Sequence, residues 1–320
     1  VRTTDNDGCS LSPVLAGTGG WRVPVKSYNR HYDTVRAEIA GMYGVVTRNA
    51  EEVEWPEFDV GFYEVKDVTG RAAEPLSNAV NMISCFGDNA GVNADSDLAA
   101  VDAEGTPATR EQPYFDWSHV CPTHERYREG LLEIVADSAD ANDDVRLDDI
   151  GFPREEYCRC DRCEERFAES EYDDRFAWRA AEITDFVASA AERIPGRTYL
   201  TLYPDPYPGH LYRRAGIDVE ALAEYVDEFV VPLYDTEYAT TYWVETIAKG
   251  FESLLDPFDA SFSVELYAVD VDVDDLIGVT DVAETYGDNV YFGYDASNAA
   301  AAVRRKGADE RSGVTHRPEN

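Results

Sequence analysis

The chain has 320 residues, 44% of them apolar, and a formal net charge of -36. The apolar fraction can fill the core of a large domain, whereas the longest apolar runs cover only a few residues and cannot span a membrane. The negative charge repels nucleic acid and anionic membrane surfaces, so neither is expected as a partner.

The acidic residues are spread over the whole chain and lysine is scarce, since only 4 of the 28 basic residues are lysine. Self-repulsion at this charge strains a fold in dilute buffer, and molar salt relieves it by screening charges over about 3 Å. This pattern predicts a halophilic protein, with an ordinary acidic bacterial protein as the alternative. No charged and apolar leader opens the sequence, which indicates a cytoplasmic location. Nothing in the sequence indicates an oligomeric state.

The first 120 residues show the least regular pattern. Residues 1–20 and 307–320 are polar and aperiodic, and we predict disordered ends there and a single domain over 21–306. The first strand is predicted at 44–47 or at 23–26, the second at 59–63 and the third at 80–86.

From residue 120 onward, strands and helices alternate. The predicted strands are 145–150, 198–203, 228–234, 261–268 and 289–294, and the predicted helices are 122–138, 161–194, 218–226, 240–255, 273–286 and 297–305. Repeated strand–helix units predict a parallel sheet. No glycine-rich phosphate loop follows a strand, and polar or aromatic residues end each one, so an α/β fold of the (β/α)₈ TIM barrel type is favoured over a doubly wound sheet.

Four of the six cysteines have the spacing of a metal site. Three form a Cys-x-Cys-x-x-Cys run, and the fourth lies upstream of the helix that leads to strand 145–150. Thiolates bind zinc tetrahedrally, and four protein ligands close the ion to substrate, so a structural zinc is predicted. The histidines at 119 and 124 are possible replacements for one sulfur, and thiols without a metal are the alternative. The predicted ligands are Cys121, Cys158, Cys160 and Cys163.

Two carboxylates stand out at the ends of predicted strands. Counting back from the end, 145–150 is strand four and 261–268 is strand seven, so Asp149 and Glu265 face each other across a barrel mouth. Glu265 lies in an apolar strand, where a buried carboxylate is costly unless it is paired or used. Hydrolysis of a glycosidic bond needs an acid and an opposing carboxylate. Asp148 and Asp149 are adjacent, so only one of them can face the barrel centre.

Other acidic and aromatic residues at the strand ends are predicted to bind a carbohydrate, because sugar rings stack on aromatic faces. For about half of the tyrosines, ordinary core packing is the better interpretation. A divalent-metal hydrolase that uses Asp148, Asp149 and His210 is an alternative, but no pair of histidines has metal spacing. The predicted substrate-binding residues are Asp148, Tyr203, Asp205, Tyr234, Asp235 and Tyr267.

With these residues in place, the chain resembles the clan A glycoside hydrolases, and residues 121–167 look like the family 42 β-galactosidases. That family carries a four-cysteine zinc site whose Cys-x-Cys-x-x-Cys run follows the catalytic end of strand four; here the run is followed by the helix start Glu164-Glu165-Arg166-Phe167. Residues 148–153, with Cys121-Pro122 before them, are also similar to uncharacterised glycosidase-like barrels. The resemblance implies an acid/base on strand four, a nucleophile on strand seven and a retaining mechanism.

The chain departs from that family at strand four, where Asp148-Asp149 stands in place of Asn-Glu. Aspartate is one methylene shorter, so inversion or loss of activity are alternatives to retention. The sequence therefore predicts a glycoside hydrolase with Asp149 as acid/base and Glu265 as nucleophile. A catalytically silent carbohydrate-binding barrel is the alternative from another class.

Overall fold

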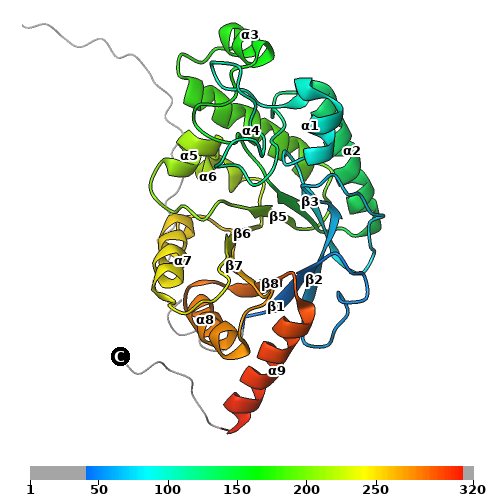
Figure 1. Cartoon of the computed structure of the whole chain (residues 1–320), viewed down its shortest axis with the longest axis vertical. Helices are drawn as coiled ribbons and strands as arrows, with labels where there is room; N and C mark the ends of the chain where they lie inside the picture. Colours follow the sequence, from blue (N-terminus) through cyan, green and yellow to red (C-terminus); the bar gives the residue numbers. More distant parts are fainter. Residues whose placement is uncertain (1–40, 313–320) are drawn as a thin grey trace, which may run out of the picture. The chain divides into compact units, whose positions relative to one another are not determined.

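The computed structural model describes residues 41–312, and the strands in this range close a parallel barrel (Figure 1). Each strand pairs with its neighbours in chain order, and β8 closes the barrel by pairing with β1. The strands are β1 (Tyr43–Thr47), β2 (Val60–Lys66), β3 (Val80–Ser84), β4 (Val145–Asp148), β5 (Thr198–Thr201), β6 (Glu228–Leu233), β7 (Ser261–Tyr267) and β8 (Asn289–Gly293).

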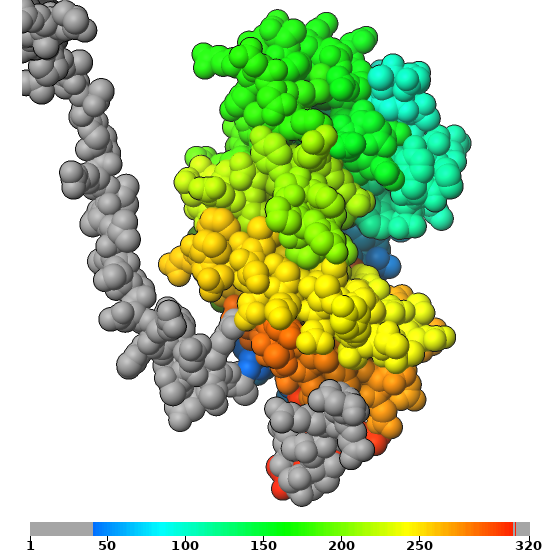
Figure 2. Space-filling view, turned by 90° about the vertical axis from the view of Figure 1, so that its left-hand side faces the viewer, coloured from blue at the N-terminus to red at the C-terminus, as the bar shows by residue number. Residues whose placement is uncertain are grey.

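Helices follow the strands from β3 to β8 and form the outer layer of the barrel there, whereas β1 and β2 are followed by loops. In the side view, successive parts of the chain from green through yellow to orange lie next to one another on the surface (Figure 2). None of the helices between residues 41 and 312 is long and apolar enough to cross a membrane. The helices are α1 (Asn89–Ala94), the 3₁₀ helix η2 (Ser96–Leu98), α2 (Glu125–Ala141), α3 (Asp161–Glu169), α4 (Arg175–Ala191), α5 (His210–Ala215), α6 (Val219–Leu222), α7 (Tyr242–Leu255), α8 (Val273–Tyr286) and α9 (Ala296–Ser312).

The predicted (β/α)₈ barrel is confirmed, and every strand from 145 onward begins at the predicted residue. Of the two candidates for the first strand, 44–47 corresponds to β1, and 23–26 lies outside the described residues. The predicted disorder of 1–20 lies outside them as well. Helix α9 continues to Ser312, so the domain boundary predicted at 307 falls within this helix, and 313–320 are not among the described residues.

The stretch 161–194, predicted as continuously helical, is two helices, α3 and α4. The interruption arises from local capping, because Asp174 accepts hydrogen bonds from the backbone N–H groups of Phe176 and Ala177 and so begins a new helix. A short helix that was not predicted, α5, lies between Gly209 and Gly216, both of which have positive φ angles of 77° and 71°. These capping residues were visible in the sequence, but the apolar periodicity across the gap obscured them.

The core has two layers. Apolar and aromatic side chains fill the barrel interior, and a larger cluster packs the outer faces of the strands against the helices. Phe62 illustrates the inner layer, since its ring lies 5.3 Å from that of Tyr199 and 4.7 Å from that of Tyr291. The barrel is therefore a packed core, and ligands must approach it at one end.

Candidate active site at the carboxyl ends of the strands

Glu265 lies inside the barrel, on β7, and is completely buried. Arg146, two residues before the end of β4, is also buried, and its Nη2 lies 2.5 Å from Glu265 Oε2. The hydroxyl of Tyr234, which follows β6, donates a hydrogen bond to Glu265 Oε1. Burial lowers the pKa of Arg146, but the negative charges of Glu265 and Asp148 outweigh burial and raise this pKa above its ordinary value.

Asp149 follows β4 and has a positive φ of 50°, which turns its side chain toward β3. Its Oδ2 lies 2.5 Å from Ser84 Oγ. Burial, and next the negative charge of Asp148, raise the pKa of the Asp149 carboxyl to about 8. The Asp149 carboxyl is therefore largely protonated at neutral pH.

Asp148 is directed differently from Asp149. Its negative charge acts on Arg146, on Glu64 of β2 and on Tyr294 after β8, three groups contributed by different strands of the barrel. Strand alternation explains this, because Asp148 and Arg146 are two residues apart and share a face. Asp148 thus faces the barrel axis, whereas Asp149, which was expected to face Glu265 across the barrel mouth, lies against β3.

A second buried carboxylate, Glu64, lies on β2 and was not predicted. Arg48 contacts it through Nε and lies 3.3 Å from Asp67, and the hydroxyl of Tyr294 lies 3.2 Å from Glu64 Oε1. Burial raises the pKa of Glu64, although Arg48 acts in the opposite direction. About half of the Arg48 side chain is exposed, so a cation fixed by two carboxylates is accessible to solvent.

The predicted carbohydrate-binding residues have different environments. Tyr234 and Tyr267 lie together, with ring centroids 5.3 Å apart, beside Glu265. Tyr203 is part-buried, and its electrostatic partners include Asp149 and Asp148. Asp205 lies in the loop after β5 and contacts His210 Nδ1 at 3.1 Å, and Asp235 accepts a hydrogen bond from the N–H of Thr236.

Several charged residues of the site were missed by the sequence reasoning. The same criterion that selected Glu265, a charged residue inside an apolar strand, also applies to these positions in the sequence. They were overlooked because partners from different strands become visible only in the barrel register. These residues are Glu64, Lys66 and Arg146, together with the uncharged Ser84 and Tyr294.

The four predicted metal ligands are brought together. Their sulfur atoms all lie within 4.8 Å of one another, with Cys121 Sγ 3.7 Å from Cys160 Sγ and 3.5 Å from Cys163 Sγ. Zinc–sulfur bonds of about 2.3 Å place the sulfurs of a tetrahedral site about 3.8 Å apart, so the cluster can hold such an ion. Among residues 41–312, the four cysteines are the only group of three or more possible ligands close enough to hold one metal ion. Asp148, Asp149 and His210 do not form such a group.

Hydrogen-bonding groups of other residues lie next to the sulfurs of the cysteine cluster. The hydroxyl oxygen of Thr123 lies 3.2 Å from Cys121 Sγ and 3.2 Å from Cys163 Sγ, and the N–H of Val101 donates to Cys158 Sγ. Hydrogen bonds among the four thiols lower the pKa of Cys121 and Cys160 and raise that of Cys158 and Cys163. Such donors around the sulfurs are typical of metal sites.

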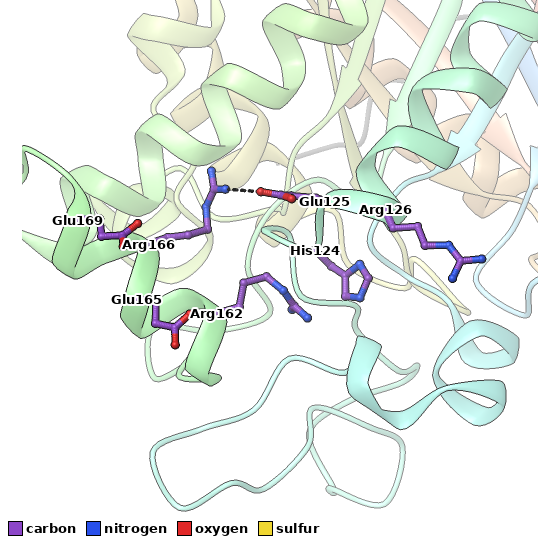
Figure 3. Close-up of a pocket in the computed structure, with 7 residues that line it drawn as sticks. All are labelled: His124, Glu125, Arg126, Arg162, Glu165, Arg166 and Glu169. Atoms are coloured by element: carbon purple, nitrogen blue, oxygen red, sulfur yellow. Dashed lines mark hydrogen bonds and ion pairs between the residues drawn. The ribbon is translucent and has the colours of Figure 1, made fainter.

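A surface pocket next to the cysteine cluster is a weaker candidate for a functional site. It lies between the first turn of α2 and helix α3, where Arg166 pairs with Glu125 (Figure 3). Its arginines and glutamates balance in charge, and it contains none of the predicted catalytic carboxylates. Its lining residues are His124, Glu125, Arg126, Arg162, Glu165, Arg166 and Glu169.

The fold and site define a (β/α)₈ barrel with buried carboxylates at the carboxyl ends of its strands. A scan of protein-family models gives no match to the sequence, and a search of curated proteins gives none either. Among solved structures, an α-L-fucosidase isoenzyme 2 from Paenibacillus thiaminolyticus is similar with a TM-score of 0.59 and 12% identity, over 82% of this chain and 46% of that one. The chain thus spans about half the length of the fucosidase, and the likeness concerns the fold.

Two chitinases superimpose more loosely. The enzyme from Chromobacterium violaceum gives a TM-score of 0.47 at 11% identity, over 84% of this chain and 99% of that one. The enzyme from Rhizomucor miehei gives 0.48 at 10% identity, over 83% and 99%. These values are too low to support an argument about this protein. The resemblance to the family 42 β-galactosidases remains a prediction.

Proposed function

We propose that the protein is a glycoside hydrolase in which Asp149 is the general acid/base and Glu265 the nucleophile. The observation that carries the proposal is the pair of contrasting environments of two carboxyls on strands four and seven. Glu265 forms an ion pair with a buried arginine, whereas the raised pKa of Asp149, about 8, keeps it protonated at neutral pH. A protonated acid and an ionised carboxylate are the pair that glycoside hydrolysis requires.

In this proposal Asp149 protonates the leaving oxygen while Glu265 attacks the anomeric carbon. Glu265 Oε1 is covered by the Tyr234 hydroxyl, so Tyr234 must release this oxygen before a covalent intermediate can form. Asp149, now ionised, then takes a proton from the water that hydrolyses the intermediate, and the anomeric configuration is retained.

The carbohydrate would bind over the carboxyl ends of β4 to β8. Tyr234 and Tyr267 offer paired rings beside Glu265, and about two fifths of Tyr234 is exposed to solvent. Asp148 faces the barrel axis and can accept hydrogen bonds from sugar hydroxyls. Asp205 and Asp235 lie farther out along the loops, where they would bind the rest of the substrate.

The four cysteines would hold a structural zinc ion. All four positions of a tetrahedral ion are then filled by protein, so the metal takes no part in hydrolysis. Its role would be to join the loop after β3, which carries Cys121, to the loop and helix after β4, which carry the other three. Both loops belong to the face that carries the proposed site.

The complete burial of Glu265 favours a second candidate, a carbohydrate-binding barrel without catalysis. A nucleophile must touch the anomeric carbon, and in this structure the Glu265 side chain has no exposed surface. If Tyr234 never releases Oε1, the same residues hold a sugar without cleaving it.

A panel of aryl glycosides, assayed in molar KCl, tests the proposal. We expect turnover that survives chelator, and a first product of retained anomeric configuration by proton NMR. Binding of a sugar without turnover would favour the silent barrel, and chelator-sensitive turnover would favour metal-dependent hydrolysis. Absence of both binding and turnover across the panel would contradict the proposal.

A further inference from the structure

Ser84, the last residue of β3, connects Asp149 to the backbone of the next loop. Its Oγ lies 2.5 Å from Asp149 Oδ2 and 3.0 Å from the carbonyl oxygen of Gly87. A methyl group added at Gly87 would lie 2.9 Å from Asp149 Oδ2 and 3.0 Å from Ser84 Oγ. Ser84, Gly87 and Asp149 therefore form one close-packed contact.

A serine hydroxyl carries one hydrogen, and this limits what Ser84 can do. The carbonyl of Gly87 only accepts hydrogen bonds. When Ser84 donates to Gly87, the short contact with Asp149 is favourable only if Asp149 carries a proton and donates it to Ser84. When Asp149 is ionised, the Ser84 hydrogen must turn toward Asp149 instead. Both protonation states of Asp149 thus have a satisfied partner at the same position.

Lys66, on β2, makes this exchange possible. Its Nζ donates to the carbonyls of Ser84, at 2.8 Å, and Gly87, at 3.1 Å, and lies 3.5 Å from Asp88 Oδ2. The Gly87 carbonyl therefore keeps a donor when Ser84 turns away. Lys66 is 7% exposed, and its positive charge acts on Asp149 through the same small region.

We propose that Ser84 and Lys66 are positioning residues for Asp149, with the Ser84 hydroxyl turning between the Gly87 carbonyl and the Asp149 carboxyl as Asp149 gains or loses its proton. The claim that this serves an acid/base in catalysis rests on the proposed function. The hydrogen-bond exchange itself does not depend on turnover. It would hold Asp149 in one place through both halves of a reaction in which it first gives and then takes a proton.

Other charged and titratable groups also act on Asp149, and they define its electrostatic background. Asp148 and Glu64 carry negative charges that favour the protonated form, and Lys66 opposes them. The negative charge of an ionised Asp149 in turn contributes to raising the pKa of three neighbouring groups. These are Cys85 beside Ser84, Tyr127 of α2 and Tyr203 after β5.

Carboxyl-selective ¹³C NMR of protein labelled at aspartate tests the proposal directly, with Asp149→Asn identifying the Asp149 signal. A hydrogen bond to a charged group is stronger than one to a neutral group, so Ser84→Ala should raise the midpoint of the Asp149 titration by about one pH unit. Lys66→Met should also raise it, because a positive charge is lost. Ser84→Thr keeps the hydroxyl and should restore the wild-type midpoint.

Ser263→Ala is the matched control, because Ser263 is a buried serine that donates to a buried carboxylate, Glu228, elsewhere in the barrel. We expect no change in the Asp149 titration for this variant. An unchanged midpoint in Ser84→Ala, or an equal shift in Ser263→Ala, would overturn the proposal. The titration is read without substrate, so failure of the glycosidase assignment would show itself separately, as absent turnover with the expected NMR shifts.

Discussion

A glutamate is buried at each end of the barrel, and the two glutamates differ in how completely they and their partners are hydrogen-bonded. At the amino ends of the strands, Glu228 Oε1 accepts hydrogen bonds from Ser263 and Tyr291, and Oε2 pairs with Arg197 at 2.9 Å. At the carboxyl ends, Glu265 is paired with Arg146, whose Nη1 is buried and has no hydrogen-bond partner within residues 41–312. Glu228 is fully satisfied by its neighbours, whereas the Glu265 group retains unused hydrogen-bonding capacity.

This difference separates a structural carboxylate from a candidate catalytic one. Folding alone favours complete pairing of buried polar groups, because each unpaired one costs free energy. At the carboxyl ends of the strands, Arg146 Nη1 is buried without a hydrogen-bond partner among the described residues. Asp149 at the same end has its pKa raised to about 8. Buried groups that are only partly satisfied, at the end of a barrel open to substrate, are expected of a binding or catalytic site.

Matched substitutions of Glu265 and Glu228 should show the largest difference between the two ends of the barrel. Glu265→Gln should reduce glycoside turnover by at least about 1,000-fold, because it removes the nucleophile. It should also lower the melting temperature, since the buried Arg146 loses its ion-pair partner. Glu228→Gln should leave kcat within a few-fold of wild type, because its partners lie at the other end. Comparable turnover losses in both variants would refute the distinction.

Loss of the cysteine cluster should destabilise the end of the barrel that carries the proposed site more than the opposite end. We expect about one zinc per chain in the wild type, and none in Cys160→Ser, with a melting temperature lower by about 10 °C. Cys85→Ser serves as the control, since Cys85 is buried outside the cluster and should not alter the zinc content. A folded wild-type protein without metal would contradict the assignment.

Salt should act on the exposed carboxylates and hardly on the buried ones at either end. With a net charge of -36, the melting temperature should rise steeply between dilute buffer and molar KCl. Glu228→Gln should show the same slope as the wild type because a buried charge is screened little, and Asp149→Asn should show it because Asp149 is largely uncharged at neutral pH. A flat melting temperature across this range would remove the halophilic interpretation.

The pH dependence of stability should also distinguish the two ends of the barrel, with a smaller effect. The Asp149 pKa rises from an ordinary value of 3.8 to about 8 on folding. Between these values the folded state holds a proton that the unfolded state has lost, so this group makes stability fall as pH rises, by at most about 1.4 kcal/mol per pH unit. Asp149→Asn should flatten denaturation midpoints between pH 4 and 8, whereas Asp205→Asn, in the loop after β5, should not. Identical pH profiles for wild type and Asp149→Asn would argue against the raised pKa.

The sequence was sufficient for the barrel and for the cysteine cluster because both depend on short-range patterns. Strands from residue 145 onward are set by apolar runs between helical segments, and the cysteines by their spacing. The environment of Glu265 was not predictable, because Arg146 and Tyr234 approach it from β4 and from the loop after β6. Strand alternation places Asp148 on the face of Arg146, but the turn of the Asp149 side chain toward β3 depends on a positive φ at Asp149, which the sequence does not signal for a non-glycine residue.

The central claim is that Asp149 acts as the acid, and a comparison of leaving groups tests it most directly. Rates should be measured for wild type, Asp149→Asn and Asp148→Asn with a dinitrophenyl glycoside, which needs little protonation, and with a methyl glycoside of the same sugar, which needs much. We predict that Asp149→Asn retains most of kcat/KM, which reports the first step, on the dinitrophenyl substrate and loses most of it on the methyl glycoside, whereas Asp148→Asn affects both alike. If Asp149→Asn slows both substrates equally and Asp148→Asn shows the selective loss, Asp149 is not the acid.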